Sequence, residues 1–259
     1  MIIVVINNKG GVGKTTLTAN LAHGMANRGH KVLVVDQDSQ ANTSSIFSPL
    51  SFDNSSYTLY NLLSDNNVSV TNCIYPTPYD LVDILPNENH TATLEVELYA
   101  DVKASYYALR NKIRSYAIDH YDYTLIDCPP NLGLFVLMSL VCADSAIIPI
   151  EAGSRYSIDG FVAAYEAIQA ASARLNHSLR FLRAVINKVD MRTSISKASV
   201  ASLRRRFGDR LFDTTIPINT DIQKAEMDRQ TVIRYAPQCA GAKRFRMLTD
   251  ELLRITDAG

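Results

Sequence analysis

Residues 6–16 read I-N-N-K-G-G-V-G-K-T-T, and they directly follow the apolar run M-I-I-V-V at residues 1–5. The apolar run is rich in β-branched residues and predicts a buried strand. The glycine cluster after it predicts a tight loop, because glycine adopts left-handed backbone conformations at little energetic cost. A helix predicted to begin near Lys14 follows. The stretch therefore predicts a strand, a loop and a helix in direct succession, which is typical of an α/β protein.

The loop at segment 8–15, N-K-G-G-V-G-K-T, matches the phosphate-binding P-loop pattern G-x-x-x-x-G-K-[ST] except at its first position, where Asn8 replaces glycine. Backbone N–H groups of such a loop turn toward one anion, and the positive end of the following helix adds to the attraction. We expect Lys14 to contact the β and γ phosphates and the Thr15 hydroxyl to bind Mg²⁺. The alternative, a tight turn without a ligand, is disfavoured because strand, loop and helix agree. The expected phosphate-binding residues of the loop are Gly10, Gly11, Val12, Gly13, Lys14 and Thr15.

Three aspartates follow predicted strands. Asp127 ends the run Y-T-L-I at residues 123–126, and Asp36 and Asp38 follow the run V-L-V-V at residues 32–35. The carboxyl ends of parallel strands face the crevice in which ligands of such sheets bind. Mg²⁺ keeps several waters and takes few protein ligands, so carboxylates on neighbouring strands suit it. Each aspartate alone could be a turn or helix cap, but together with the loop they predict a hydrolytic site.

Composition limits the class of protein. The 259 residues, 47% of them hydrophobic, suffice for one core, and we expect a single domain over residues 1–259. The 26 basic residues equal the 26 acidic ones, so an anionic partner must meet a local basic patch. The four cysteines show no C-x-x-C spacing and the five histidines are scattered, which argues against an iron–sulfur or histidine metal site and fits a reducing cytosol. There is no leader pattern and no apolar run of about 18 residues, so we expect a soluble protein that is not exported.

Short β-branched runs alternate with stretches of helical period along the chain. This pattern predicts a three-layer, doubly wound, mostly parallel sheet flanked by helices. The expected strands are 1–6, 31–36, 123–127, 144–150, 181–187 and 213–216, and the expected helices are about 14–28, 104–119, 157–175, 195–207 and 239–256. Segment 43–103 has polar turns and a weak strand at 81–85, and we interpret it as an elaboration of the same domain.

The motifs K-G-G-V-G-K-T-T, D-Q-D-S-Q-A-N, D-C-P-P-N-L-G and I-P-I-N together resemble the ParA family of deviant Walker-A ATPases, relatives of MinD and Soj. The resemblance runs from end to end and includes the tail, where Y-A-P at residues 235–237 and E-L at 251–252 fall where the family has similar motifs. It implies a P-loop NTPase fold of the deviant Walker-A type, with ATP and Mg²⁺ as cofactors.

The resemblance also implies roles for single residues. Lys9 is similar to the signature lysine that crosses to the partner subunit and contacts the other molecule's nucleotide in a sandwich dimer. Asp38 is similar to the residue that orients the attacking water, and Thr16 to the one that meets the α-phosphate. The implied catalytic residues are Lys9, Lys14 and Asp38, and the implied metal residues are Thr15, Asp36 and Asp127.

Base recognition stays open between adenine and guanine. Residues 187–190 read N-K-V-D, which is the base-reading motif N-K-x-D of guanine-specific GTPases. The ParA family has a similar T-x-x-D at this place and nevertheless uses ATP. We therefore favour ATP, with Asn187 and Pro217 as base contacts.

The family's ATP-bound dimers bind DNA without sequence preference and are released when a partner protein triggers hydrolysis. The resemblance thus implies a homodimer, nonspecific DNA, a ParB-like or other adaptor, and a cytoplasmic, nucleoid-associated protein. The chain begins at its first predicted strand, so we expect no helix-turn-helix extension and no operator-specific repression. The candidate DNA-binding residues are Arg192, Arg204, Arg205, Arg206, Lys243, Arg244 and Arg246. A solvated helix surface is the commoner explanation for three consecutive arginines in an arbitrary protein, but with this resemblance we favour DNA binding. Ile218 and Asp221 replace arginines that serve DNA in many members, which indicates a shifted or weaker surface.

Two other classes of function compete with this interpretation. A MinD-like membrane switch needs a basic amphipathic tail, and residues 252–259, L-L-R-I-T-D-A-G, have one cation and one acid. We therefore expect no membrane partner. A metabolic P-loop enzyme is the second class, but no cysteine pair for an iron–sulfur protein and no second-substrate motif is visible. The cargo stays open among a plasmid, a chromosome region and a protein organelle.

Overall fold

The computed structural model describes residues 1–48, 53, 56–153 and 157–257. Within them lies one seven-stranded sheet in the order β3-β4-β2-β5-β1-β6-β7. All pairs of neighbouring strands are parallel except β3 with β4. The strands are β1 (Ile2–Val5), β2 (Val32–Asp36), β3 (Tyr75–Pro76), β4 (Val82–Leu85), β5 (Tyr123–Asp127), β6 (Ser145–Glu151) and β7 (Arg180–Asn187). The predicted mostly parallel sheet is confirmed.

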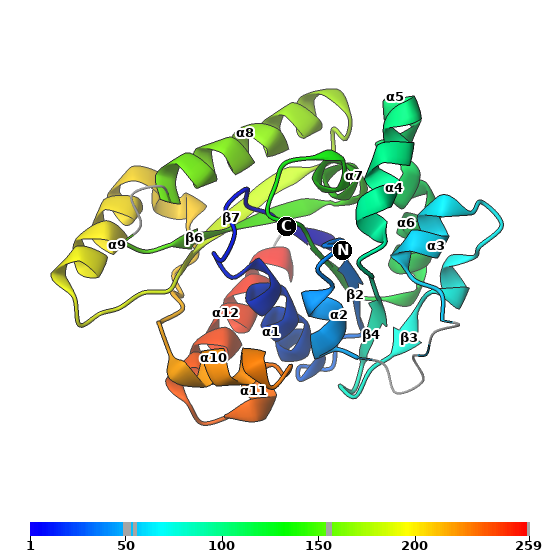
Figure 1. Cartoon of the computed structure of the whole chain (residues 1–259). Helices are drawn as coiled ribbons and strands as arrows, with labels where there is room; N and C mark the ends of the chain where they lie inside the picture. Colours follow the sequence, from blue (N-terminus) through cyan, green and yellow to red (C-terminus); the bar gives the residue numbers. More distant parts are fainter. Residues whose placement is uncertain (49–52, 54–55, 154–156, 258–259) are drawn as a thin grey trace.

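Helices cover both faces of the sheet and complete three layers (Figure 1). The first face carries α3 (Leu59–Ser64), α6 (Ala108–His120), α7 (Leu134–Cys142), α8 (Ser157–Arg174) and α9 (Ser194–Phe207). The second face carries α1 (Lys14–Ala26), α2 (Asn42–Ile46), α10 (Thr220–Met227), α11 (Val232–Tyr235) and α12 (Ala240–Asp257). The remaining helical segments are α4 (Thr91–Leu98), α5 (Val102–Ser105) and the 3-10 turns η1 (Val70–Asn72), η2 (Tyr99–Asp101) and η3 (Gly208–Arg210).

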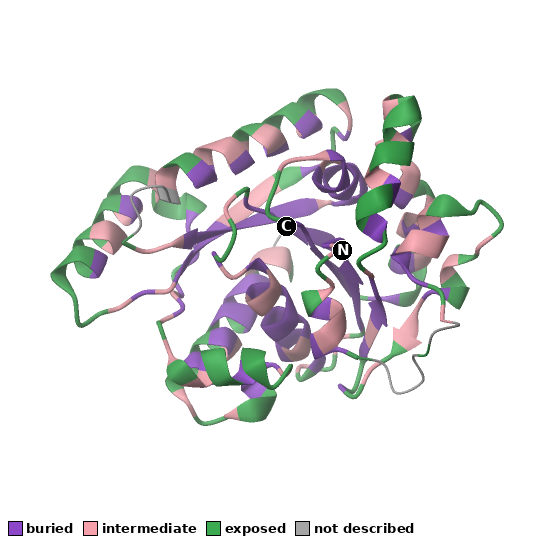
Figure 2. Cartoon of the chain, viewed as in Figure 1, coloured by how far each residue is buried: buried purple, intermediate pink, exposed green. Residues whose placement is uncertain are grey.

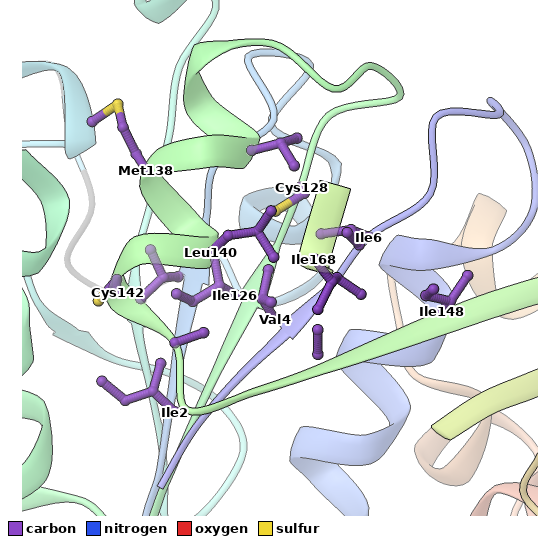
Figure 3. Close-up of a cluster of buried hydrophobic side chains, with 14 of the residues drawn as sticks. Ile2, Val4, Ile6, Ile126, Cys128, Met138, Leu140, Cys142, Ile148 and Ile168 are labelled. Carbon is purple, nitrogen blue, oxygen red and sulfur yellow. The ribbon is translucent and has the colours of Figure 1, made fainter. Parts of the chain in front are cut away.

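The central strand β1 is buried on both faces because helices lie above and below it. Ile2, Val4 and Ile6 belong to the core of the first face, and Ile3 and Val5 belong to the core of the second. Side chains of successive strand residues alternate between faces, so an entirely apolar strand fills both cores. Figure 3 shows part of the first core, and Figure 2 shows buried strands beneath helices whose outer faces are exposed. This packing fixes the end of β1, where the glycine loop begins.

The predicted strand at 213–216 is wrong. This segment contacts β7 through bridges at its flanks, and the structure assigns no strand to it. The backbone N–H groups of Asp213 and Thr214 instead donate to the carboxylate of Glu251 in α12, at 2.6 and 2.8 Å. A buried side chain therefore takes the donors that a sheet ladder needs. The sequence pattern did not reveal this competition.

Segment 43–103 contributes to the sheet as well as to its cover. Its weak strand at 81–85 is confirmed as β4, which pairs with β2. The expected helix at 104–119 is divided into α5 and α6. Helix α7 was not predicted, because its sequence L-F-V-L-M-S-L-V-C is apolar on every side and shows no helical period. Among the described residues, no helix is long and apolar enough to span a membrane.

Candidate functional site

The glycine loop between β1 and α1 requires glycine at two positions. Gly11 and Gly13 have φ angles of +73° and +91°, in the left-handed region that strains other residues. A side chain at Gly13 would also collide with the amide nitrogen of Asn187, which donates a 2.7 Å hydrogen bond to the carbonyl of Val12. Strand β7 thus holds the loop in place. Gly13 also precedes the first residue of α1 and has no side chain to cap its N–H groups, so these donors suit an external anion.

Lys14 is the first residue of α1 and is 7% exposed. Its ammonium donates a 3.3 Å hydrogen bond to the carbonyl of Lys9. Burial lowers the pKa of Lys14, and the nearby carboxylate of Asp127 partly offsets this effect. A buried cation with one long hydrogen bond to a carbonyl is suited to an anionic ligand, which would replace the lost hydration.

Asp36 and Asp127 are neighbours at the carboxyl ends of β2 and β5. Both are fully buried, and burial raises the pKa of each carboxyl; the charge of Asp127 raises that of Asp36 further. The hydroxyls of Thr15 and Thr43 both donate to Oδ2 of Asp127, at 2.7 and 2.6 Å. Among the described residues, no hydrogen-bond donor contacts its Oδ1. Two buried carboxyls, a hydroxyl and an orphaned carboxyl oxygen fit a hard divalent cation such as Mg²⁺.

The carboxylates of Asp36, at the end of β2, and Asp38 have different hydrogen-bond partners. Asp36 accepts hydrogen bonds at Oδ2 from the N–H (2.8 Å) and the hydroxyl (2.7 Å) of Ser44. Asp38 lies two residues later, and its Oδ1 accepts from the N–H of Gln40 at 3.0 Å. Asp38 lines a cavity that lies over the glycine loop, whereas Asp36 is not among the described residues that line it. The cavity therefore presents Asp38 to a ligand and keeps Asp36 behind it.

A cavity of about 720 Å³ lies over the loop, which is within the usual range for small-molecule sites. Its walls come from the glycine loop, the segment after β2, the end of β6, the end of β7 and α10. The predicted residues that line it are Gly10, Gly11, Gly13, Lys14, Thr15, Thr16, Asp38, Asn187 and Pro217. The structure thus brings both ends of the predicted nucleotide site into one cavity.

The N-K-V-D segment is divided between the cavity and the surface. Asn187 and Lys188 line the cavity, and Lys188 has a φ of +54°. Asp190 is not among the described lining residues, and its carboxylate accepts from Nε and Nη2 of Arg192, at 2.8 and 2.9 Å. These hydrogen bonds lower the pKa of Asp190 to about 2. The carboxylate that would read guanine therefore pairs with an exposed arginine two residues away.

Two glutamates of the cavity were missed from the sequence. Glu151, the last residue of β6, forms a 2.5 Å ion pair with Lys9. Glu226 in α10 accepts a hydrogen bond from the hydroxyl of Thr16. Glu151 ends a strand as Asp127 does, and this signal could have identified it. Glu226 lies 210 residues from Thr16, and no local pattern connects them.

The candidate DNA-binding residues do not form one surface. Arg204, Arg205 and Arg206 are in the last turn of α9, on the first face of the sheet. Three further candidates, Lys243, Arg244 and Arg246, are near the start of α12 on the second face. Figure 1 shows the two helices well separated. Arg192 is 86% exposed but paired with Asp190.

Comparisons with known proteins show the family and the fold of this chain. A family model described as an AAA domain matches residues 1–181. The sporulation initiation inhibitor protein Soj of Bacillus subtilis is 31% identical over 252 residues, which cover 97% of each protein. The cell division ATPase MinD of Pyrococcus furiosus has a TM-score of 0.80 at 27% identity and covers 98% of both chains. Cobyrinic acid a,c-diamide synthase of Mycobacterium smegmatis, with bound ADP and magnesium, has a TM-score of 0.83 at 25% identity, covering 100% of this chain and 96% of the synthase.

The similarity to Soj spans almost the whole chain. The sheet order and the cavity over the loop are those expected of a P-loop protein. The chain belongs to the ParA/Soj family of P-loop ATPases.

Proposed function

We propose that this protein is a Mg²⁺-dependent ATPase that positions cargo. Two copies close around two ATP molecules, bind DNA without sequence preference, and separate when a ParB-like or other adaptor accelerates hydrolysis. The cycle distributes a plasmid, a chromosome region or a protein organelle in the cytoplasm, at the nucleoid. The observation that carries the proposal is a cavity lined by Lys14 and Asp38, with the second lysine, Lys9, paired to the lining residue Glu151.

The residues of the cavity divide the work of hydrolysis. The loop amides and Lys14 hold the phosphates, and Asp38 orients the water that attacks the γ-phosphorus as the bond to ADP breaks. The hydroxyl of Thr15 and the carboxylates of Asp127 and Asp36 would hold Mg²⁺ and its water shell. When bound, Mg²⁺ neutralises charge on the phosphate oxygens. The hydrogen bond from Gln40 keeps the Asp38 carboxylate fixed beside the cavity.

A second cation explains why dimerisation would depend on ATP. The side chain of Lys9 is 31% exposed, which is enough for it to extend toward a second subunit. A lysine that reaches the partner's nucleotide stabilises the negative charge that grows in the transition state. Association would then require the triphosphate, because it supplies the anion that both lysines contact.

We predict that Lys14→Ala abolishes ATP binding, because it removes the buried cation of the phosphate site. Asp38→Ala is expected to keep ATP binding and to lower turnover by about 100-fold, since it removes the group that orients water. Nucleotide binding and phosphate release would be measured separately. Asp119→Ala, at an exposed position of α6, is the matched control. Unchanged hydrolysis by Asp38→Ala would refute the assignment.

The pairing of Asp190 with Arg192 supports ATP over GTP. A carboxylate recognises guanine by accepting from two of its N–H groups, and here both oxygens already accept from Arg192. We predict that GTP competes with labelled ATP about tenfold more weakly than unlabelled ATP. Arg192→Ala should narrow the difference between GTP and ATP as competitors, because it releases the carboxylate of Asp190. The double variant Arg192→Ala with Asp190→Ala should restore the difference, because that carboxylate is then absent. Equal competition by GTP in the natural protein would contradict ATP selectivity.

DNA binding is proposed for the exposed basic residues at the end of α9 or the start of α12. Phosphate contacts dominate nonspecific affinity, so log affinity for random duplex DNA should fall linearly with log salt. The affinity should also rise when Mg·ATP is added to the hydrolysis-deficient protein. Paired reversals, Arg205→Glu with Arg206→Glu and Lys243→Glu with Arg244→Glu, identify the helix that is used. Salt-independent affinity, or no gain with ATP, would contradict this part of the proposal.

A metabolic role is the second candidate, because the M. smegmatis synthase shares the fold at a TM-score of 0.83. The 31% identity to Soj over 97% of both proteins favours positioning. Acceleration of ATP hydrolysis by DNA together with an adaptor is expected of a positioning ATPase and not of an amide-forming enzyme.

A further inference from the structure

Lys9 and Glu151 form an ion pair within one subunit, between the glycine loop and the end of β6. The distance from Nζ to Oε2 is 2.5 Å, and the two side chains are 31% and 28% exposed. Glu151 also lines the cavity. The cation proposed to reach the partner's nucleotide is therefore held beside its own nucleotide site.

The backbone of Lys9 is fixed relative to β6. Its N–H donates to Oδ1 of Asn7 at 2.9 Å, and Nδ2 of Asn7 donates to the carbonyl of Pro149 in β6 at 2.8 Å. Its carbonyl accepts the 3.3 Å hydrogen bond from Lys14. Since the backbone is held on both sides, Lys9 can reach a second subunit only by rotating its side chain away from Glu151.

Two kinds of anion thus compete for the same ammonium. Glu151 carries one negative charge and is always present, whereas a nucleotide in a second subunit carries three or four charges only when it is bound. A partly exposed ion pair is weak enough to be exchanged, because water screens it. The γ-phosphate adds charge at the place where ADP has none, so the exchange favours ATP over ADP.

We propose that Glu151 is a positioning residue that withholds Lys9 from the second subunit until ATP is bound there. The inference rests on the proposed function, since it requires that Lys9 acts across a dimer. Glu151 sets the concentration of Mg·ATP at which the subunits associate, and it lowers association in ADP. It acts through Lys9 and does not contact the reacting atoms.

The test measures dimer formation by sedimentation velocity during titrations with Mg·ATP and Mg·ADP. All proteins carry Asp38→Ala to prevent turnover. Glu151→Gln keeps the shape of the side chain and removes its charge, and it should lower the half-maximal Mg·ATP concentration by about fivefold. It should also increase the dimer fraction in Mg·ADP. Glu151→Asp, which keeps the charge, should stay nearer to the parent, and Glu97→Gln on the exposed side of α4 should equal it.

A variant of Lys9 separates positioning from a direct effect on the nucleotide. In the Lys9→Ala background, Glu151→Gln should change nucleotide affinity less than about twofold, because the side chain of Lys9 is no longer there to be released. A change of about fivefold in nucleotide affinity in the Lys9→Ala background would overturn the inference. An unchanged or higher half-maximal Mg·ATP concentration for dimer formation by Glu151→Gln would overturn it as well. If the parent and Glu151→Gln both stay monomeric, the proposed function fails as well. If the parent dimerises with an unmoved midpoint, only the role of Glu151 fails.

Discussion

The fold buries three ionisable groups side by side in one site, an amine and two carboxyls. Lys14, Asp36 and Asp127 are each less than a tenth exposed, at the carboxyl edge of the central strands. Burial shifts the pKa of all three toward the neutral form. Such an arrangement is stabilised by a ligand that brings several negative charges and a divalent cation. A Mg²⁺-bound polyphosphate, as proposed for this site, would meet that requirement.

This constraint also explains the geometry around the charges. The loop adopts left-handed conformations at Gly11 and Gly13, and Asn187 anchors it from β7. Hydroxyls of Thr15 and Thr43 occupy one oxygen of Asp127 and leave the other for the cation shell. In the proposed cycle, the bound nucleotides hold two subunits together, because Lys9 of each subunit contacts the nucleotide of the other.

The sequence predicted those parts of the structure that depend on local pattern. The glycine loop, the apolar strands and the aspartates after them are signals within about ten residues, and the structure assembles them as expected. Contacts that join distant segments left no local signal. Glu226 reaches Thr16 from 210 residues away, and Glu251 takes the N–H groups of Asp213 and Thr214. The basic residues of α9 and α12 failed to converge because the sheet separates their helices.

The central claim is that ATP joins two subunits, and the molar mass of the protein in solution tests it most directly. Light scattering of the Asp38→Ala form, saturated with Mg·ATP, should report twice the 28.7 kDa mass of one chain. The same protein with Lys9→Ala should report the mass of one chain, because the bridging cation is lost. A single-chain mass for Asp38→Ala with saturating Mg·ATP would contradict the account.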